Sequence, residues 1–211
     1  MTEQSQIRTR QGLHAVAELL LAGPQHREHG TIRLRPVPGG FGTVAGPDVQ
    51  VVGTELVRST GAGLLRLSLD GAQIDELAAQ AGLEPGAPVG LYPDTTGASL
   101  DHRLQVDSRH AERLADWFEV GDRALRRLDP QAVPVIWPEH FDLAISLDEV
   151  NYGVSPGDGY STEPYAYVGP FTQRPGAFWN APFGATRSIG EVGTVDALVD
   201  FFEQGRQAAT R

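Results

Sequence analysis

Two residues that could share one chemical task, His140 and Asp142, stand two positions apart in a stretch of alternating apolar and polar residues. The alternation over residues 141–148 predicts a β-strand, and side chains two apart on a strand point to the same face, about 7 Å from each other. At that spacing an imidazole and a carboxylate could bind one transition-metal ion, or the carboxylate could lie near the imidazole. The solvated outer face of an antiparallel sheet shows the same pattern and is the simpler interpretation.

Aromatic and acidic side chains are concentrated around this pair. Residues 131–173 hold six carboxylates and seven Phe, Tyr or Trp side chains, with no Lys or Arg. Ligand pockets are commonly aromatic, and aromatic rings beside carboxylates suit sugars or amine-bearing ligands. Sheet packing and turn-rich connections explain the same residues without a ligand. The candidate ligand-binding residues are Trp137, His140, Asp142, Tyr152, Asp158, Tyr165, Tyr167, Trp179 and Asn180; His140 and Asp142 are also the candidates for a metal site.

One short motif in this region suggests a hydrolase, but its surroundings argue against that interpretation. Residues 153–157 match G-x-S-x-G, in which the serine must follow a strand and precede a helix. Pro156 and Gly157 oppose such a helix, and no histidine follows Ser155 in the chain. We therefore interpret residues 151–163 as an ordered polar loop, in which the calcium-binding spacing of an EF-hand is absent.

Composition excludes several classes of chemistry. All 17 basic residues are Arg and the chain has no Cys, which excludes Schiff-base and thiol catalysis, disulfides and zinc sites built on Cys. The net charge is −10, the pI is about 5.0 and no basic patch is visible, so a nucleic-acid partner is not expected. The polar N-terminus and the lack of a long apolar run predict neither a signal peptide nor a membrane span, and a cytoplasmic location is expected.

Apolar periodicity predicts about four helices separated by β-rich segments. Gly23-Pro24 is expected to end the first helix, Asp70 to cap the second and Thr194 to cap the last. Residues 83–106 are rich in loop-forming residues. The predicted helices are residues 11–22, 72–81, 108–128 and 195–209, and the clearest strands are 31–36, 49–52 and 64–69.

Because helices and strands do not alternate one for one, the sequence predicts an α+β fold. We expect a mostly antiparallel sheet, or two sheets, covered by about four helices. Residues 1–211 are expected to form a single domain, and the loop at 83–106 is the candidate boundary if the chain is divided.

Four C-terminal motifs carry a resemblance to other proteins. WPEHFDLA (137–144), NYGVSPGD (151–158), PYAYVGP (164–170) and FWNAPFGA (178–185) resemble a family of uncharacterised bacterial proteins, and the likeness extends to the N-terminal stretches HAVAELLLAG and GGFGT. The arrangement is similar to a second family of unknown function. Neither resemblance implies an activity, a cofactor or a catalytic residue.

Two classes of function follow from these observations. The first is a small-molecule-binding protein or enzyme with an acidic, aromatic-lined pocket formed by residues 137–185. The second is a non-catalytic interaction or assembly module, such as a homo-oligomer, that uses the same surface. No cofactor is indicated.

Overall fold

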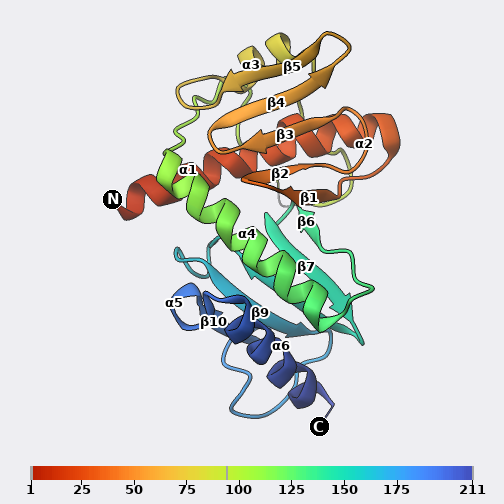
Figure 1. Ribbon diagram of the computed structural model, residues 1–211, viewed down its shortest axis with the longest axis vertical. Helices are drawn as coiled ribbons and strands as arrows, with labels where there is room; N and C mark the ends of the chain where they lie inside the picture. The colour runs from red at the N-terminus through yellow and green to blue at the C-terminus, as the bar shows by residue number, and fades with distance from the viewer. Residues whose placement is uncertain (1, 94, 211) are drawn as a thin grey trace. The chain divides into compact units, whose positions relative to one another are not determined.

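The computed structural model describes residues 2–93 and 95–210, and the chain divides into two compact units (Figure 1). The first unit comprises residues 1–116 and 136–141, and the second comprises 117–135 and 142–211. The division falls inside one long helix and on both sides of residues 136–141, not in the loop at 83–106. The expectation of a single domain stays a prediction.

The first unit begins with a helical segment that is longer than the sequence predicts. It consists of α1 (Glu3–Val16), a π-helical segment η1 (Ala17–Ala22) and α2 (Gly23–His29), and it ends at Gly30 with φ of 69°. The prediction that Gly23-Pro24 ends the helix is wrong. In the π-helical segment the N–H of Gly23 bonds the carbonyl of Glu18, five residues back. In this register residue 24 would donate its N–H to the carbonyl of Leu19, but proline has no N–H. The N–H of Gly86 bonds that carbonyl instead, at 3.0 Å.

An antiparallel sheet packs against this helical segment. Residue Leu34 of β1 pairs with Ile136 of β6, and η1 packs against β1 and β2. The buried core between them includes Leu20, Phe41 and Val51. The strand order is β6-β1-β2-β3-β4-β5, with bounds Val135–Trp137 (β6), Leu34–Val37 (β1), Gly40–Thr43 (β2), Val49–Val52 (β3), Glu55–Thr60 (β4) and Gly63–Ser68 (β5).

Helix α3 (Ile74–Ala81) closes this part of the first unit. Its N-cap is Gln73, which forms a capping box with Glu76, and Gly82 follows in the left-handed conformation with φ of 60°. The prediction that Asp70 caps this helix is wrong. The Asp70 carboxylate accepts the N–H of Val106 at 2.9 Å instead, so it fixes the start of the segment that leads into the next helix.

The second unit contains a four-stranded antiparallel sheet with helices on one face. The helices after Asp107 and Thr194 begin where the sequence predicts, because these two side chains accept backbone N–H groups of the first turns. The strand order is β7-β8-β9-β10, with bounds Asp142–Leu147 (β7), Val150–Ser155 (β8), Tyr165–Pro170 (β9) and Ala185–Ser188 (β10). The helices are α4 (Ser108–Leu128), whose residues from 117 onward belong to this unit, α5 (Ile189–Val192) and α6 (Val195–Ala209).

Glycines bring two of these helices close to the sheet. A Cβ at Gly121 of α4 would lie 2.5 Å from Val154, and one at Gly205 of α6 would lie 2.7 Å from Val168.

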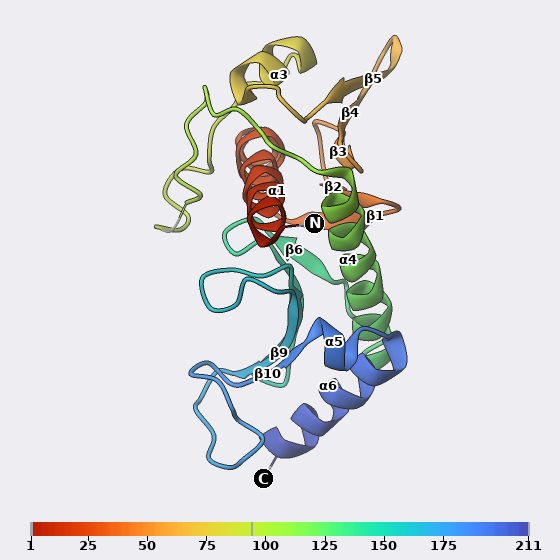
Figure 2. The same cartoon turned by 90° about the vertical axis from the view of Figure 1, so that its left-hand side faces the viewer.

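In Figure 2 the helices stand on one side of β9 and β10, and the loops extend on the other. Helices packed on mostly antiparallel strands confirm the predicted α+β fold class. No helix in the described part of the chain is both long and apolar enough to cross a bilayer.

Candidate functional site

A tight hairpin decides which side chains of the second unit face away from the helices. Strands β7 and β8 are joined by Asp148 and Glu149, whose φ angles of 51° and 61° are those of a two-residue type I′ turn. The turn starts β8 at Val150, so the prediction that residues 151–163 form a loop is wrong for 151–155. Only the later part of that segment connects strands.

On the sheet face without helices, strand β8 has a gap where a side chain would otherwise lie. Gly153 of β8 pairs with Ala144 of β7 and Tyr167 of β9. A Cβ at Gly153 would lie 2.6 Å from the Tyr167 ring, so only glycine lets that ring lie across β8. The Tyr167 hydroxyl thereby reaches β7 and donates a hydrogen bond to Oδ2 of Asp142, which is buried. Burial and the Asp142 carboxylate raise the pKa of Tyr167 well above its ordinary value, which keeps the phenol protonated as a donor.

A second tyrosine–aspartate pair lies next to the first. The Tyr165 hydroxyl donates to Oδ2 of Asp158 at 2.5 Å, and burial followed by this hydrogen bond raises the Tyr165 pKa. The other oxygen of Asp158 accepts the backbone N–H groups of Tyr160 and Ser161 at 2.7 and 3.2 Å. Asp158 is therefore occupied in holding the β8–β9 loop. The Tyr165 and Tyr167 ring centroids are 6.4 Å apart, which joins the two pairs into one cluster.

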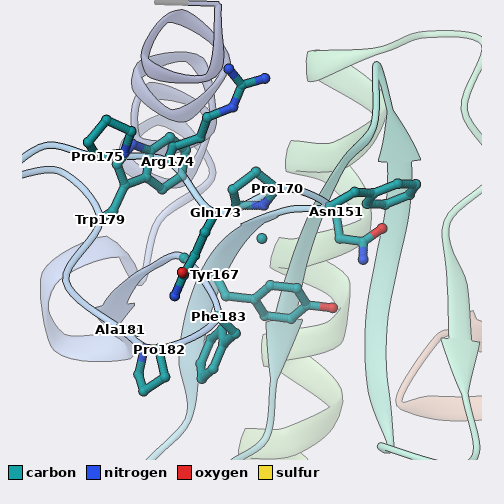
Figure 3. Close-up of a pocket in the computed structure, with 13 residues that line it drawn as sticks. Asn151, Tyr167, Pro170, Gln173, Arg174, Pro175, Trp179, Ala181, Pro182 and Phe183 are labelled. Atoms are coloured by element: carbon teal, nitrogen blue, oxygen red, sulfur yellow. The ribbon is translucent and has the colours of Figure 1, made fainter.

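A pocket of about 740 Å³ opens beside Tyr167 on the same unit (Figure 3). Its size falls in the range of sites for small molecules. Strands β8 and β9 supply one wall and the loop at 171–184 supplies the other. In Figure 3 the Tyr167 ring lies between Phe183 and Asn151, and its hydroxyl points away from Trp179. The lining residues are Asn151, Tyr167, Gly169, Pro170, Phe171, Gln173, Arg174, Pro175, Trp179, Ala181, Pro182, Phe183 and Gly184.

Aromatic contacts hold the rim of this pocket. The Phe183 ring contacts Tyr160 edge to face with centroids 5.0 Å apart, and Trp179 contacts Phe178 in the same way at 4.9 Å. Phe183 is nevertheless 41% exposed, and Phe171 is 63% exposed. Large apolar rings left open at the mouth of a pocket are a feature of binding surfaces.

Two predicted pocket residues of the second unit have other roles. Tyr152 is fully buried on the helix-covered face, where its ring packs on Phe202, and burial raises its pKa to about 12. Alternation along β8 places its side chain on the opposite sheet face from Gly153, so Tyr152 does not line this pocket. The Asn180 side chain bonds both backbone groups of Thr186, at 2.8 and 3.3 Å, and so anchors the loop to β10. Asn180 does not line the pocket.

Trp137 and His140 belong to the first unit. The Arg33 guanidinium lies 5.8 Å from the centre of the Trp137 ring. His140 is exposed, in a turn before β7, and its Nε2 lies 3.9 Å from a carboxylate oxygen of Glu139. The prediction that His140 and Asp142 share one strand face is wrong, because the strand begins at Asp142 and Phe141 before it has a φ of 53°. Among the residues that the structure describes, no group of three or more His, Cys, Asp or Glu side chains is arranged to hold a metal ion.

A buried polar cluster in the first unit was not predicted. The carboxylate of Glu18, in η1, accepts hydrogen bonds from the Tyr92 hydroxyl at 3.2 Å and from the backbone N–H and hydroxyl of Thr96 at 3.0 and 2.5 Å. One turn earlier, Nε2 of His14 lies 2.6 Å from the Pro138 carbonyl oxygen. A carbonyl only accepts, so Nε2 carries the proton, and burial lowers the His14 pKa. The carboxylate ties the loop at 83–106 to the helix.

Most of the pocket lining could not be found from the sequence. Gln173, Arg174 and Phe183 come from an irregular loop whose path follows from no periodicity. Gly153 offered a signal, since a glycine inside a strand often marks a close approach of another group.

No family model, curated protein or solved structure matches this chain. The resemblance of the C-terminal motifs to a bacterial family therefore stays a prediction.

Proposed function

We propose that the second unit binds a small molecule in the pocket between β9 and the loop at 171–184. The observation that carries this proposal is the combination of a concave site of about 740 Å³ with exposed aromatic rings at its mouth. Burial of Phe183 or Trp179 against a ligand would contribute about 1.5–3 kcal/mol for each side chain fully covered. The site is concave, which favours a ligand over the flat aromatic patch that an assembly surface would present.

The Tyr167–Asp142 hydrogen bond supports the proposal in a second way. Because its hydroxyl is held by a buried carboxylate, the Tyr167 ring is fixed before any ligand arrives. A preformed wall lowers the entropy lost on binding. Asn151 is fixed likewise, since the Ser146 hydroxyl bonds its side chain at 2.6 Å.

The experiment is a thermal-shift and ligand-observed NMR screen of the full chain against a panel of small fragments. A ligand at a hundred times its dissociation constant stabilises the protein by about 2.7 kcal/mol, which raises the melting temperature. We expect hits whose binding is lost in Phe183→Ala and in Trp179→Ala. Leu64→Ala, at an exposed apolar residue of the first unit, is the control and should keep every hit. Hits that bind all three variants equally, or a panel with no hit, would overturn the proposal.

A further inference from the structure

The charge of the pocket lining is opposite in sign to that of the acidic segment 131–173, which supplies part of the lining. Among the described lining residues, the only ionisable group charged at neutral pH is Arg174. The carboxylates expected to make the pocket acidic are absent from the lining. Asp142 accepts the Tyr167 hydroxyl, and Asp158 accepts the Tyr165 hydroxyl and two backbone N–H groups. The aspartates thus hold the tyrosines in place.

The polar groups around the pocket are mainly hydrogen-bond donors. The Ser146 hydroxyl bonds Oδ1 of Asn151, which leaves the Nδ2 amide protons of that side chain for a ligand. The Tyr167 hydroxyl proton is used by Asp142, so this oxygen can offer only a lone pair. The Arg174 guanidinium brings five N–H donors and cannot lose its charge near neutral pH.

Arg174 also lacks the carboxylate partner that three other arginines of the second unit have. In the same unit, Arg126, Arg127 and Arg206 pair with carboxylates at 2.9, 2.5 and 2.7 Å. Arg174 makes no ion pair or hydrogen bond with any residue in the described part of the chain. An arginine at the edge of a pocket, whose guanidinium has no carboxylate partner in the protein, is suited to bind one from a ligand.

We infer that the pocket takes small organic anions, carboxylates above all, whose charged group is bound by Arg174 and whose flat or apolar body packs on Trp179 and Phe183. This inference rests on the proposed function and adds the chemical class of the ligand. It excludes the amine-bearing ligands that the acidic composition of residues 131–173 suggests, because a cation would meet Arg174 instead of a carboxylate.

The test compares matched ligands. A set of small aromatic scaffolds, phenylacetate among them, is screened with each scaffold as its carboxylate, its primary amide and its amine. We expect the carboxylates to bind about tenfold more tightly than the amides, and the amines most weakly. The preference of carboxylate over amide should disappear in Arg174→Gln and persist in Arg123→Gln, a control at an exposed arginine of α4 outside the lining. The carboxylate affinity should also fall with added salt, whereas the amide affinity should not.

Failure of this inference differs from failure of the proposed function. Equal binding of carboxylate and amide, both lost in Trp179→Ala, would overturn the anion preference and leave the pocket as a binding site. A preference that survives in Arg174→Gln would overturn the role of Arg174. No binding of any scaffold in any form would count against the pocket itself.

Discussion

Replacing Tyr167 by Phe tests whether the buried tyrosine–aspartate pair holds the second unit together. The change keeps the ring that lies across Gly153 and removes only the hydroxyl that donates to Asp142. Asp142 is 7% exposed, so little water can replace the lost donor. Loss of a hydrogen bond to a buried carboxylate costs about 1–3 kcal/mol of unfolding free energy. With an m-value of about 2 kcal/mol per molar urea, a loss of about 2 kcal/mol of unfolding free energy lowers the urea concentration at the unfolding midpoint by about 1 M.

The assay is urea unfolding at pH 7, followed by the fluorescence of buried tryptophan, and Tyr160→Phe is the matched control. Tyr160 is 49% exposed, and its hydroxyl bonds no residue in the described part of the chain, so its loss should change the unfolding free energy by less than about 0.5 kcal/mol. A double-mutant cycle with Asp142→Ala should give a coupling energy of about 0.5–3 kcal/mol. If Tyr167→Phe unfolds at the same urea concentration as Tyr160→Phe, the hydroxyl contributes nothing and the account of a preorganised wall is refuted.

Three further predictions concern the first unit. Glu18→Ala removes the acceptor of three hydrogen bonds, so peptides covering residues 84–100 should exchange their amide protons faster in hydrogen-exchange mass spectrometry; unchanged protection would contradict the role of this carboxylate. Gly23→Ala should lower the melting temperature although Ala favours helix by about 1 kcal/mol, because a Cβ there would overlap the Gly86 carbonyl; Gly190→Ala, whose Cβ would make only an ordinary contact with the Ser188 hydroxyl at 3.8 Å, is the control, and equal melting temperatures would refute the close approach. The lowered His14 pKa means that the unfolded chain binds a proton more readily than the folded one, so stability should fall as pH drops below about 6.5 toward the folded pKa. Nitrogen NMR should find the Nε2–H tautomer at pH 7, and the opposite tautomer would contradict the bond to Pro138.

Elements whose ends depend on neighbouring residues could be predicted from the sequence. The last helix begins after Thr194 and the long helix after Asp107, because each cap bonds N–H groups two or three residues ahead. The helix that passes through Gly23-Pro24 could not be predicted in this way. Its continuation depends on Gly86, more than sixty residues later in the chain, which bonds the carbonyl that Pro24 leaves open.

The position of side chains on the sheet was predictable only inside the strand. Leu143 and Ile145 face the helices and Ser146 the other side, as alternation requires. His140 does not follow this alternation, because Phe141 has a positive φ and the extended backbone of β7 begins only after it. Nothing in the local sequence marks Phe as a residue that adopts this conformation, since bulky side chains seldom do.

The chemical character of the pocket could not be predicted from the composition of residues 131–173, because composition does not show which charges are already bound. Burial of a carboxylate is costly unless donors satisfy it, so an acidic and tyrosine-rich strand pair can use its acids internally. Tyr167 and Tyr165 do this for Asp142 and Asp158, and the first of these bonds exists only because Gly153 clears a path across β8. The charge that reaches the pocket then comes from Arg174, the first basic residue after the acidic segment. If this reasoning holds, Gly153→Ala should displace the Tyr167 ring and weaken ligand binding as strongly as Trp179→Ala does, although Gly153 does not line the pocket. Binding of the same ligands by Gly153→Ala with unchanged affinity would show that the ring does not depend on the gap.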